Sequence, residues 1–207
     1  MDESMPPIIR ESHPIRWAVR RWLGPGALTD FKQRAFSMSD REIIAACAAT
    51  HESRGDRPSD TTDAQRRWVL QRLCVAPHRV LEIGSGNGVL SLALRNAGHC
   101  VTQLDLFPTG SAIGCAEHLP FADGSFDCVV ATHTIEHVRS LTKTFNEIAR
   151  VARRALLVVP MQRFYRVTFD YHLHFFYSPE HFASHIPSGT AKASVIDGDI
   201  VMDWATS

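Results

Sequence analysis

The sequence lacks an excess of charge of either sign, because 22 Lys and Arg balance 22 Asp and Glu among 207 residues. Proteins that neutralise nucleic-acid phosphates usually carry a basic excess, so small or neutral substrates are favoured over nucleic acid. The sequence also lacks an apolar run approaching the roughly 20 residues of a membrane span. Its acidic start, Met1-Asp2-Glu3-Ser4, has no hydrophobic signal core. These absences predict a soluble, cytoplasmic protein.

Cysteine is scarce and unpatterned. The five cysteines include no CxxC pair, so neither a disulfide framework nor a zinc knuckle is indicated, and a reducing compartment fits best. Hydrophobic residues make up 44% of the chain and charged residues 21%, as in an ordinary globular protein with one core. No pattern indicates an oligomeric state.

The first 75 residues carry helical periodicity without strand alternation, and we expect a helical cover over the rest of the chain. A short amphipathic helix is predicted there, with Ile15, Val19 and Trp22 on one side and Arg16 and Arg20 on the other. We interpret it as a lid or packing helix, with contact to an anionic membrane surface as the weaker alternative.

Two capping boxes predict further helices in this cover. Ser39-x-x-Glu42 precedes one apolar helical pattern and Thr62-x-x-Gln65 precedes another. The polar stretch over 51–60 between them predicts a loop.

Residues 76–207 have the pattern of an α/β domain. Short apolar runs alternate with helical segments, which predicts a Rossmann-like parallel sheet with helices on both faces. The expected strands are 80–83, 101–105, 126–131 and 155–159, followed by an antiparallel hairpin of 191–195 and 200–204. The expected helices are 89–97, one capped by Ser140 that runs to 151, and one opening at Ser178-Pro179.

A glycine-rich turn follows the first of these strands. It has the sequence Glu82-Ile83-Gly84-Ser85-Gly86-Asn87-Gly88, and Asp105 ends the next strand. Glycines let the chain turn sharply and let a ligand approach the backbone, while a strand-end carboxylate can accept both hydroxyls of a ribose. The GxGxG spacing differs from the GxGxxG of dinucleotide folds, and the preceding acid favours a cationic cofactor over a pyrophosphate.

The segment from Arg79 to about Phe182 resembles the class I S-adenosylmethionine-dependent methyltransferases of the methyltransferase 11 type. The resemblance rests on VLEIGSGNG at 80–88, LDL at 104–106, AEHLPFADGSFDCVVA at 116–131, IEHV at 135–138 and FNEIARVARRALLVVP at 145–160. It implies S-adenosylmethionine as the cofactor. The implied cofactor-binding residues are Glu82, Gly84, Ser85 and Gly86 around the methionine part, Asp105 at the ribose, Leu106, Cys115, Ala116 and Glu117 near the adenine, and Thr132 and His133 below the sulfonium.

Two features depart from the family pattern. Only LFPTGSAIGC separates Asp105 from Ala116, which is too short for the usual helix and strand, so we expect a stunted third strand. Cys115 stands where the family often has an Asp that accepts a hydrogen bond from the adenine amino group, and a thiol accepts such bonds only weakly. We therefore expect backbone groups and apolar contacts to hold the adenine.

Histidines follow the fourth predicted strand in the pattern His133-x-x-Glu136-His137. His137 is a candidate general base, because the pKa of imidazole suits proton transfer near neutral pH. A loop-orienting role is the alternative. The triplet also resembles the ExxEH metal site of ubiquinone-pathway O-methyltransferases, but His133 in place of the first Glu disfavours a hard cation. No metal is expected, and activity is expected to survive chelation.

An unusual aromatic segment follows the fifth predicted strand. Seven Phe and Tyr residues lie between 164 and 177, with His172 and His174 among them. The carboxyl end of that strand should border the acceptor, so the segment is either a pocket wall or a connection packed on the core. His172 and His174 are candidates to orient or deprotonate the acceptor, and two histidines alone are too few for a zinc site.

The sequence thus predicts a methyltransferase that acts on a small molecule, such as a natural product, a sugar or a quinone-like phenol, with oxygen favoured as the methylated atom. Methylation of RNA or protein is the rival within enzymes, and it would require an open or cationic groove. A cofactor-binding partner subunit without activity of its own is the rival outside enzymes. Turnover with a panel of acceptors separates the three.

Overall fold

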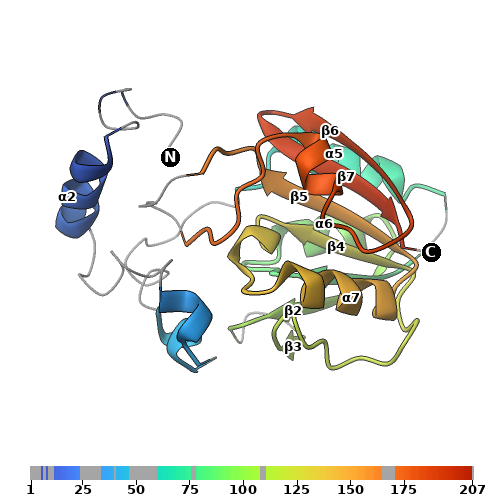
Figure 1. Ribbon diagram of the computed structural model, residues 1–207. Coiled ribbons are helices and arrows are strands. Elements are labelled where there is room, and N and C mark those ends of the chain that lie inside the picture. Colours follow the sequence, from blue (N-terminus) through green and yellow to red (C-terminus); the bar gives the residue numbers. More distant parts are fainter. Residues whose placement is uncertain are drawn as a thin grey trace.

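A computed structural model describes residues 6, 8, 12–23, 34–39, 41–46, 60–75, 78–107, 111–164 and 171–206. Its centre is a seven-stranded sheet with the order β3-β2-β1-β4-β5-β7-β6 (Figure 1). The strands are β1 (Arg79–Ile83), β2 (Cys100–Asp105), β3 (Ala112–Ile113), β4 (Cys128–Thr132), β5 (Arg154–Pro160), β6 (Thr190–Ile196) and β7 (Asp199–Ala205).

The first five strands are parallel, whereas β7 runs antiparallel to both β5 and β6. The predicted α/β fold and C-terminal hairpin are confirmed, and so is the stunted third strand, since β3 has only two residues. The order reverses between β1 and β4, where the carboxyl ends of neighbouring strands leave a crevice in folds of this kind. Any ligand of the sheet is therefore expected at the ends of β1, β2 and β4.

Helices cover both faces of the sheet. The helices of the described residues include α2 (His13–Leu23), α5 (Asp63–Arg72), α6 (Val89–Asn96), α7 (Leu141–Val151) and α8 (Pro179–Ala183), with the 3₁₀ turns η3 (Ala35–Ser37) and η4 (Ile135–His137), and α5 to α8 are the ones that pack on the sheet. The predicted caps are present, because Thr62, Ser140 and Ser178 each accept a backbone N–H of the helix that follows. The Ser39–Glu42 capping box also forms, ahead of helical residues 41–46.

Alternation along the strands divides the core into two layers. Leu81, Val129 and Leu157 face a layer that α7 and α8 complete with Phe145 and Phe182. The neighbouring residues along the same strands, such as Val80, Val130 and Leu156, point to the opposite face. There they pack against apolar side chains of α5 and α6. Figure 1 shows α7 in front of the sheet and α5 and α6 behind it. The helix α5 thus packs on the sheet, although the sequence division at residue 75 groups it with the cover.

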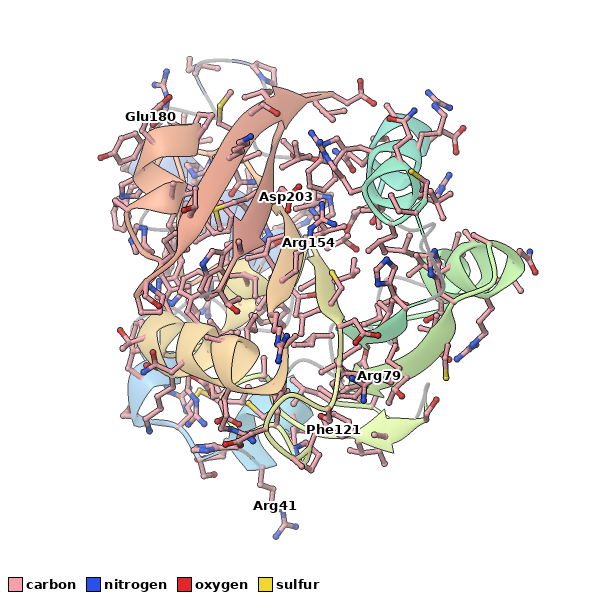
Figure 2. All side chains as sticks on the ribbon, turned by 90° about the vertical axis from the view of Figure 1, so that its right-hand side faces the viewer. Arg41, Arg79, Phe121, Arg154, Glu180 and Asp203 are labelled. Carbon is pink, nitrogen blue, oxygen red and sulfur yellow. The ribbon has the colours of Figure 1, made fainter. Side chains whose placement is uncertain are left out.

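Strands β5 and β7 are joined by an ion pair as well as by backbone hydrogen bonds. The Arg154 guanidinium donates to both carboxylate oxygens of Asp203, at 2.8 and 2.7 Å, and Figure 2 shows the two side chains on neighbouring strands. A two-point Arg–carboxylate pair fixes direction as well as distance, and it lies where the parallel part of the sheet meets the antiparallel hairpin.

The N-terminal helix forms as predicted, but the side chains that it buries are not the predicted ones. Trp22, expected to pack, is 84% exposed, and Ile15 is also exposed, whereas Arg16, expected on the polar side, is 2% exposed. A long Arg side chain can be covered along its stem, and periodicity does not say what each face of a helix meets. In Figure 1 α2 lies apart from the sheet. Among the helices that the structure describes, none is both long and apolar enough to cross a membrane.

Part of the predicted cover and of the aromatic segment lies outside the described residues. This applies to 51–59 of the predicted loop, to Arg20's side chain, and to Tyr165 and Phe169.

Candidate functional site

The turn after β1 requires glycine in three places. Gly84, Gly86 and Gly88 have φ values of +72°, +49° and +75°, a region in which side chains with a Cβ are strained. The N–H of Gly84 donates to the carbonyl of Leu104 at 2.8 Å, which ties the turn to the end of β2. The glycine motif therefore forms a tight backbone loop over the ends of the first two strands.

Asp105 holds this loop from the end of β2. One of its carboxylate oxygens accepts the Gly86 N–H at 2.8 Å, and the other accepts the Phe107 N–H at 3.1 Å. Each carboxylate oxygen can accept more than one hydrogen bond, and Asp105 is only partly buried. The side chain can therefore accept hydroxyls of a ligand while it orders two segments of backbone.

Two polar side chains are buried beneath the turn. The Glu82 carboxylate accepts the Ser91 hydroxyl of α6, and its burial raises its pKa to about 7, because the loss of solvation outweighs that hydrogen bond. The buried Ser85 Oγ has no hydrogen-bond partner among the described residues. Buried hydroxyls are nearly always bonded, so an unbonded one in a ligand loop indicates a missing partner.

The loop expected near the adenine is ordered by Glu117. Its carboxylate accepts the Cys115 thiol at 3.3 Å and the backbone N–H of Ser140, and it lies 3.6 Å from the Arg139 guanidinium. Ala116 is buried beside it. Glu117 thus anchors the start of α7, and the Cys115 sulfur is turned toward a carboxylate of the protein.

The loop after β4 lies against the glycine turn. The Thr134 hydroxyl donates to the Ile83 carbonyl at 3.2 Å, and its side chain fills the space next to Gly84. Thr132 accepts a hydrogen bond from the Thr61 hydroxyl at 3.0 Å. His133 has a φ of +51°, which is strained for a residue with a Cβ. The ends of β1 and β4 therefore meet at one place, together with the start of α5.

Glu136 lies at the centre of a histidine cluster. It is fully buried, and neither carboxylate oxygen has a hydrogen-bond partner among the described residues. Its Oε1 is 3.8 Å from His133 Nδ1, 3.8 Å from His137 Nε2 and 4.0 Å from His172 Nε2. Burial raises the pKa of Glu136, and His137 and His133 only partly offset that effect.

His133 also approaches the hairpin, with Nε2 3.4 Å from Asp199 Oδ2. Burial alone would lower the pKa of His133, but Asp199 and Glu136 outweigh it and raise the pKa. The β6–β7 turn is held here by further contacts, because Asp199 accepts the Gln65 side chain at 2.7 Å and Asp197 accepts the Thr62 hydroxyl at 2.7 Å.

The aromatic segment folds back onto η4. Backbone N–H groups of Leu173 and His174 both donate to the Glu136 carbonyl, at 2.8 and 3.0 Å. His172 consequently lies beside His137, with ring centroids 4.8 Å apart. His174 does not join them, because its Nε2 contacts the Val138 carbonyl at 2.8 Å. Two of the three candidate catalytic histidines are therefore adjacent, and the third helps to fix the segment.

Part of the N-terminal cover packs on the same segment. Tyr171 and Leu173 form a small apolar cluster with Ala35, against which Met38 packs. The Met38 carbonyl also accepts a hydrogen bond from the Arg139 side chain at 3.0 Å. Ala35 and Met38 therefore lie against the aromatic segment and the start of α7.

Four residues of this site are missing from the sequence-based set: Thr61, Glu136, Gln162 and Asp199. In the sequence Glu136 is only the acidic member of the pattern His133-x-x-Glu136-His137, and the sequence does not show that it is buried. The other three come from separate segments that approach only in the folded chain.

Comparison with known proteins shows similarity to methyltransferases. Residues 81–158 match a family model described as a methyltransferase domain. Over 122 residues the chain is 32% identical to malonyl-[acyl-carrier protein] O-methyltransferase from Geobacter sulfurreducens, covering 47% of this chain and 46% of that protein. Over 102 residues it is 34% identical to demethylmenaquinone methyltransferase from Beutenbergia cavernae, covering 42% of each.

Among solved structures, the fold is similar to that of 1,6-didemethyltoxoflavin-N1-methyltransferase from Burkholderia thailandensis. The TM-score is 0.63 at 16% identity, covering 81% of this chain and 90% of that chain. The matched part of the chain spans less than half the length of the two curated relatives. The family model, these relatives and the shared fold agree with the motif-based prediction of a class I S-adenosylmethionine-dependent methyltransferase.

Proposed function

We propose that this protein transfers the methyl group of S-adenosylmethionine to a small-molecule acceptor, with oxygen favoured as the methylated atom. The observation that carries the proposal is the loop at the ends of β1 and β2, where Asp105 keeps acceptor capacity and the buried Ser85 hydroxyl has no partner among the described residues. When bound, the cofactor supplies an electrophilic methyl group on a sulfonium.

The residues of the loop fit the polar groups of this cofactor. The Asp105 carboxylate would accept ribose hydroxyls, and the Ser85 hydroxyl would gain a partner. Glu82, whose pKa of about 7 places it at the edge of ionisation, would favour a ligand with a nearby ammonium. Gly84 and Gly86 let the ligand approach the backbone. Leu106, Ala116 and Cys115 would line the adenine side, and Thr132 and His133 the methyl side.

The acceptor would bind beside the loop after β4, bordered by the segment that follows β5 and by residues 34–46. His137 and His172 lie there, and either could orient the acceptor's polar group or take its proton. Methyl transfer needs no covalent protein intermediate, so catalysis would come chiefly from positioning and exclusion of water. The names of two relatives give a malonyl group on an acyl carrier protein and demethylmenaquinone as the acceptors of those proteins, and the second of these supports a small-molecule acceptor.

Calorimetry tests the cofactor directly. We expect S-adenosylmethionine and S-adenosylhomocysteine to bind with a Kd in the micromolar range, about −7 to −8 kcal/mol, and NAD not to bind, because the GxGxG turn offers no pyrophosphate site. Tight NAD binding without a signal from S-adenosylmethionine would contradict the proposal. Formation of S-adenosylhomocysteine with a panel of small acceptors, RNA and protein then separates a small-molecule enzyme from its rivals.

Substitution of Asp105 tests the ribose site. Asp105→Asn should weaken S-adenosylhomocysteine binding by about 1.5–3 kcal/mol, the scale of hydrogen bonds to a charged partner, which is a roughly 10- to 150-fold rise in Kd. The control is Asp123→Asn, which removes an exposed carboxylate paired with Arg150 and should leave the Kd unchanged. An unaltered Kd in a folded Asp105→Asn variant would exclude Asp105 as the ribose ligand.

A further inference from the structure

Glu136, His137 and His172 bring three possible metal-ligand atoms together. Glu136 Oε1 lies 3.8 Å from His137 Nε2 and 4.0 Å from His172 Nε2. A carboxylate oxygen and two ring nitrogens from these residues all lie within 4.8 Å of one another. The carboxylate is fully buried, and among the described residues neither of its oxygens has a hydrogen-bond partner. A buried ionised carboxylate is strongly unfavourable without a compensating positive charge.

The partners of the two Nδ1 atoms fix which ring nitrogens face the carboxylate as acceptors. His137 Nδ1 is 3.0 Å from the Tyr171 carbonyl oxygen, which can only accept, so this Nδ1 carries the proton. His172 Nδ1 is 2.7 Å from the Gln162 side-chain oxygen, which gives the same tautomer. With the proton on Nδ1, each ring presents its Nε2 to Glu136.

This arrangement is the one that metal-binding histidines adopt. Such a histidine almost always donates its other ring N–H to a carbonyl or carboxylate, which fixes the tautomer and aims the bare nitrogen at the ion. Here both outer partners are in place: the Tyr171 carbonyl for His137 and the Gln162 side chain, which follows β5, for His172. We propose that Glu136, His137 and His172 bind one divalent transition-metal ion of the zinc, iron or nickel kind.

The donor set determines the class of ion. Two imidazoles and one carboxylate suit zinc and its transition-metal neighbours, whereas magnesium and calcium prefer oxygen ligands throughout. Zinc bonds of about 2.0–2.2 Å put tetrahedral ligand atoms roughly 3.3 Å apart, so the three side chains would close slightly around an ion. Three protein ligands leave at least one position for water, and the His137 side chain, 37% exposed, gives a route from solvent.

The sequence alone led to the opposite expectation, because His133 stands where the resembling metal site has its first Glu, and this replacement disfavours a hard cation. His172 supplies a third ligand from 35 positions beyond His137. His133 stays outside the set, since its Nε2 faces Asp199. The proposal rests on these contacts and not on the methyl-transfer function, so its failure would leave that function untouched.

The test is a metal-binding titration of the chelator-treated, dialysed protein. Zn²⁺ is titrated in competition with a chromogenic chelator, and we expect one tightly bound ion per chain. His172→Gln and His137→Gln should each weaken Zn²⁺ binding by at least about 10-fold, because loss of an outer partner alone typically weakens it 10- to 100-fold. The control is His118→Ala, an exposed histidine outside the cluster, which should bind Zn²⁺ like the wild type.

Two further measurements keep the result unambiguous. S-adenosylhomocysteine binding and circular dichroism check that each variant is folded, and the half-exposed His137 offers a substitution that leaves no core cavity. Cys74→Ser/Cys100→Ser removes the two thiols that are exposed among the described residues, which could hold Zn²⁺ without a built site. The proposal is wrong if no stoichiometric ion binds, if the histidine variants bind it like the wild type, or if binding disappears with the two thiols.

Discussion

Gly84→Ala is expected to lower the free energy of unfolding by about 2–5 kcal/mol. The left-handed backbone at Gly84, with φ +72°, accounts for about 1–2 kcal/mol, and overpacking adds about 1–3 kcal/mol. An added Cβ would overlap the Thr134 hydroxyl and lie 2.7 Å from its methyl group. Thr134 cannot simply rotate away, because its hydroxyl is bonded to the carbonyls of Ile83 and Thr132, at 3.2 and 3.1 Å.

Urea denaturation measures this loss, and two variants isolate its cause. Gly98→Ala has the same kind of backbone, with φ +91° and open space around the added methyl, so it should show the backbone strain alone. Thr134→Gly in the Gly84→Ala background should restore part of the stability, because it removes the overlapping atoms. Equal losses for Gly84→Ala and Gly98→Ala would mean that Thr134 does not form a wall beside the turn. Cofactor affinity should fall with Gly84→Ala, since the turn must open to fit the methyl.

Glu82→Gln is expected to stabilise the protein at pH 8 by about 2–3 kcal/mol while changing little at pH 4.5. The folded pKa of Glu82 is about 7, above its ordinary 4.5, so between these values the folded chain holds a proton that the unfolded chain has lost. Stability therefore falls as pH rises through this window, at about 1.4 kcal/mol per unit of difference in pKa. Glutamine keeps the shape without the charge, and the variant escapes the loss.

Denaturation at several pH values between 4.5 and 8 tests this sign. Glu147→Gln is a contrasting control, because the hydrogen bond from Arg150 lowers the pKa of Glu147 and that substitution should destabilise the protein most at high pH. A constant difference between wild type and Glu82→Gln across the range would show that Glu82 is ionised throughout. If Glu82 faces a cofactor ammonium, the same substitution should weaken S-adenosylmethionine binding.

The elements that sequence predicted well are those whose signals are local. The run 80–83 became Arg79–Ile83, and Thr62-x-x-Gln65 became a complete capping box, because alternation and caps act between residues a few positions apart. The short third strand followed from a simple count of residues. The glycines of the predicted cofactor loop and Asp105 lie at the ends of β1 and β2, where the pattern places them.

The parts that sequence missed depend on contacts between distant segments. Glu136 and His172 meet because the chain after β5 folds back and donates two N–H groups to the Glu136 carbonyl, which no periodicity encodes. Arg16 was assigned to a solvent face although it is buried, because a helical pattern separates two faces without showing what covers them. His174 was given the same candidate role as His172, but its Nε2 contacts the Val138 carbonyl instead.

The order of the last strands has a consequence for how the chain is made. Strand β7 follows β6 in sequence yet lies between β5 and β6, so β6 leaves the ribosome before the strand that holds it to the sheet. Until β7 is synthesised, β5 has an open edge, and the core layer under α7 lacks Ile200, Met202 and Trp204. Unpaired strand edges and exposed apolar surface promote aggregation of partly made chains. Substitutions in β7 should therefore reduce the yield of soluble protein in cells by more than their effect on the free energy of unfolding of the folded protein would suggest.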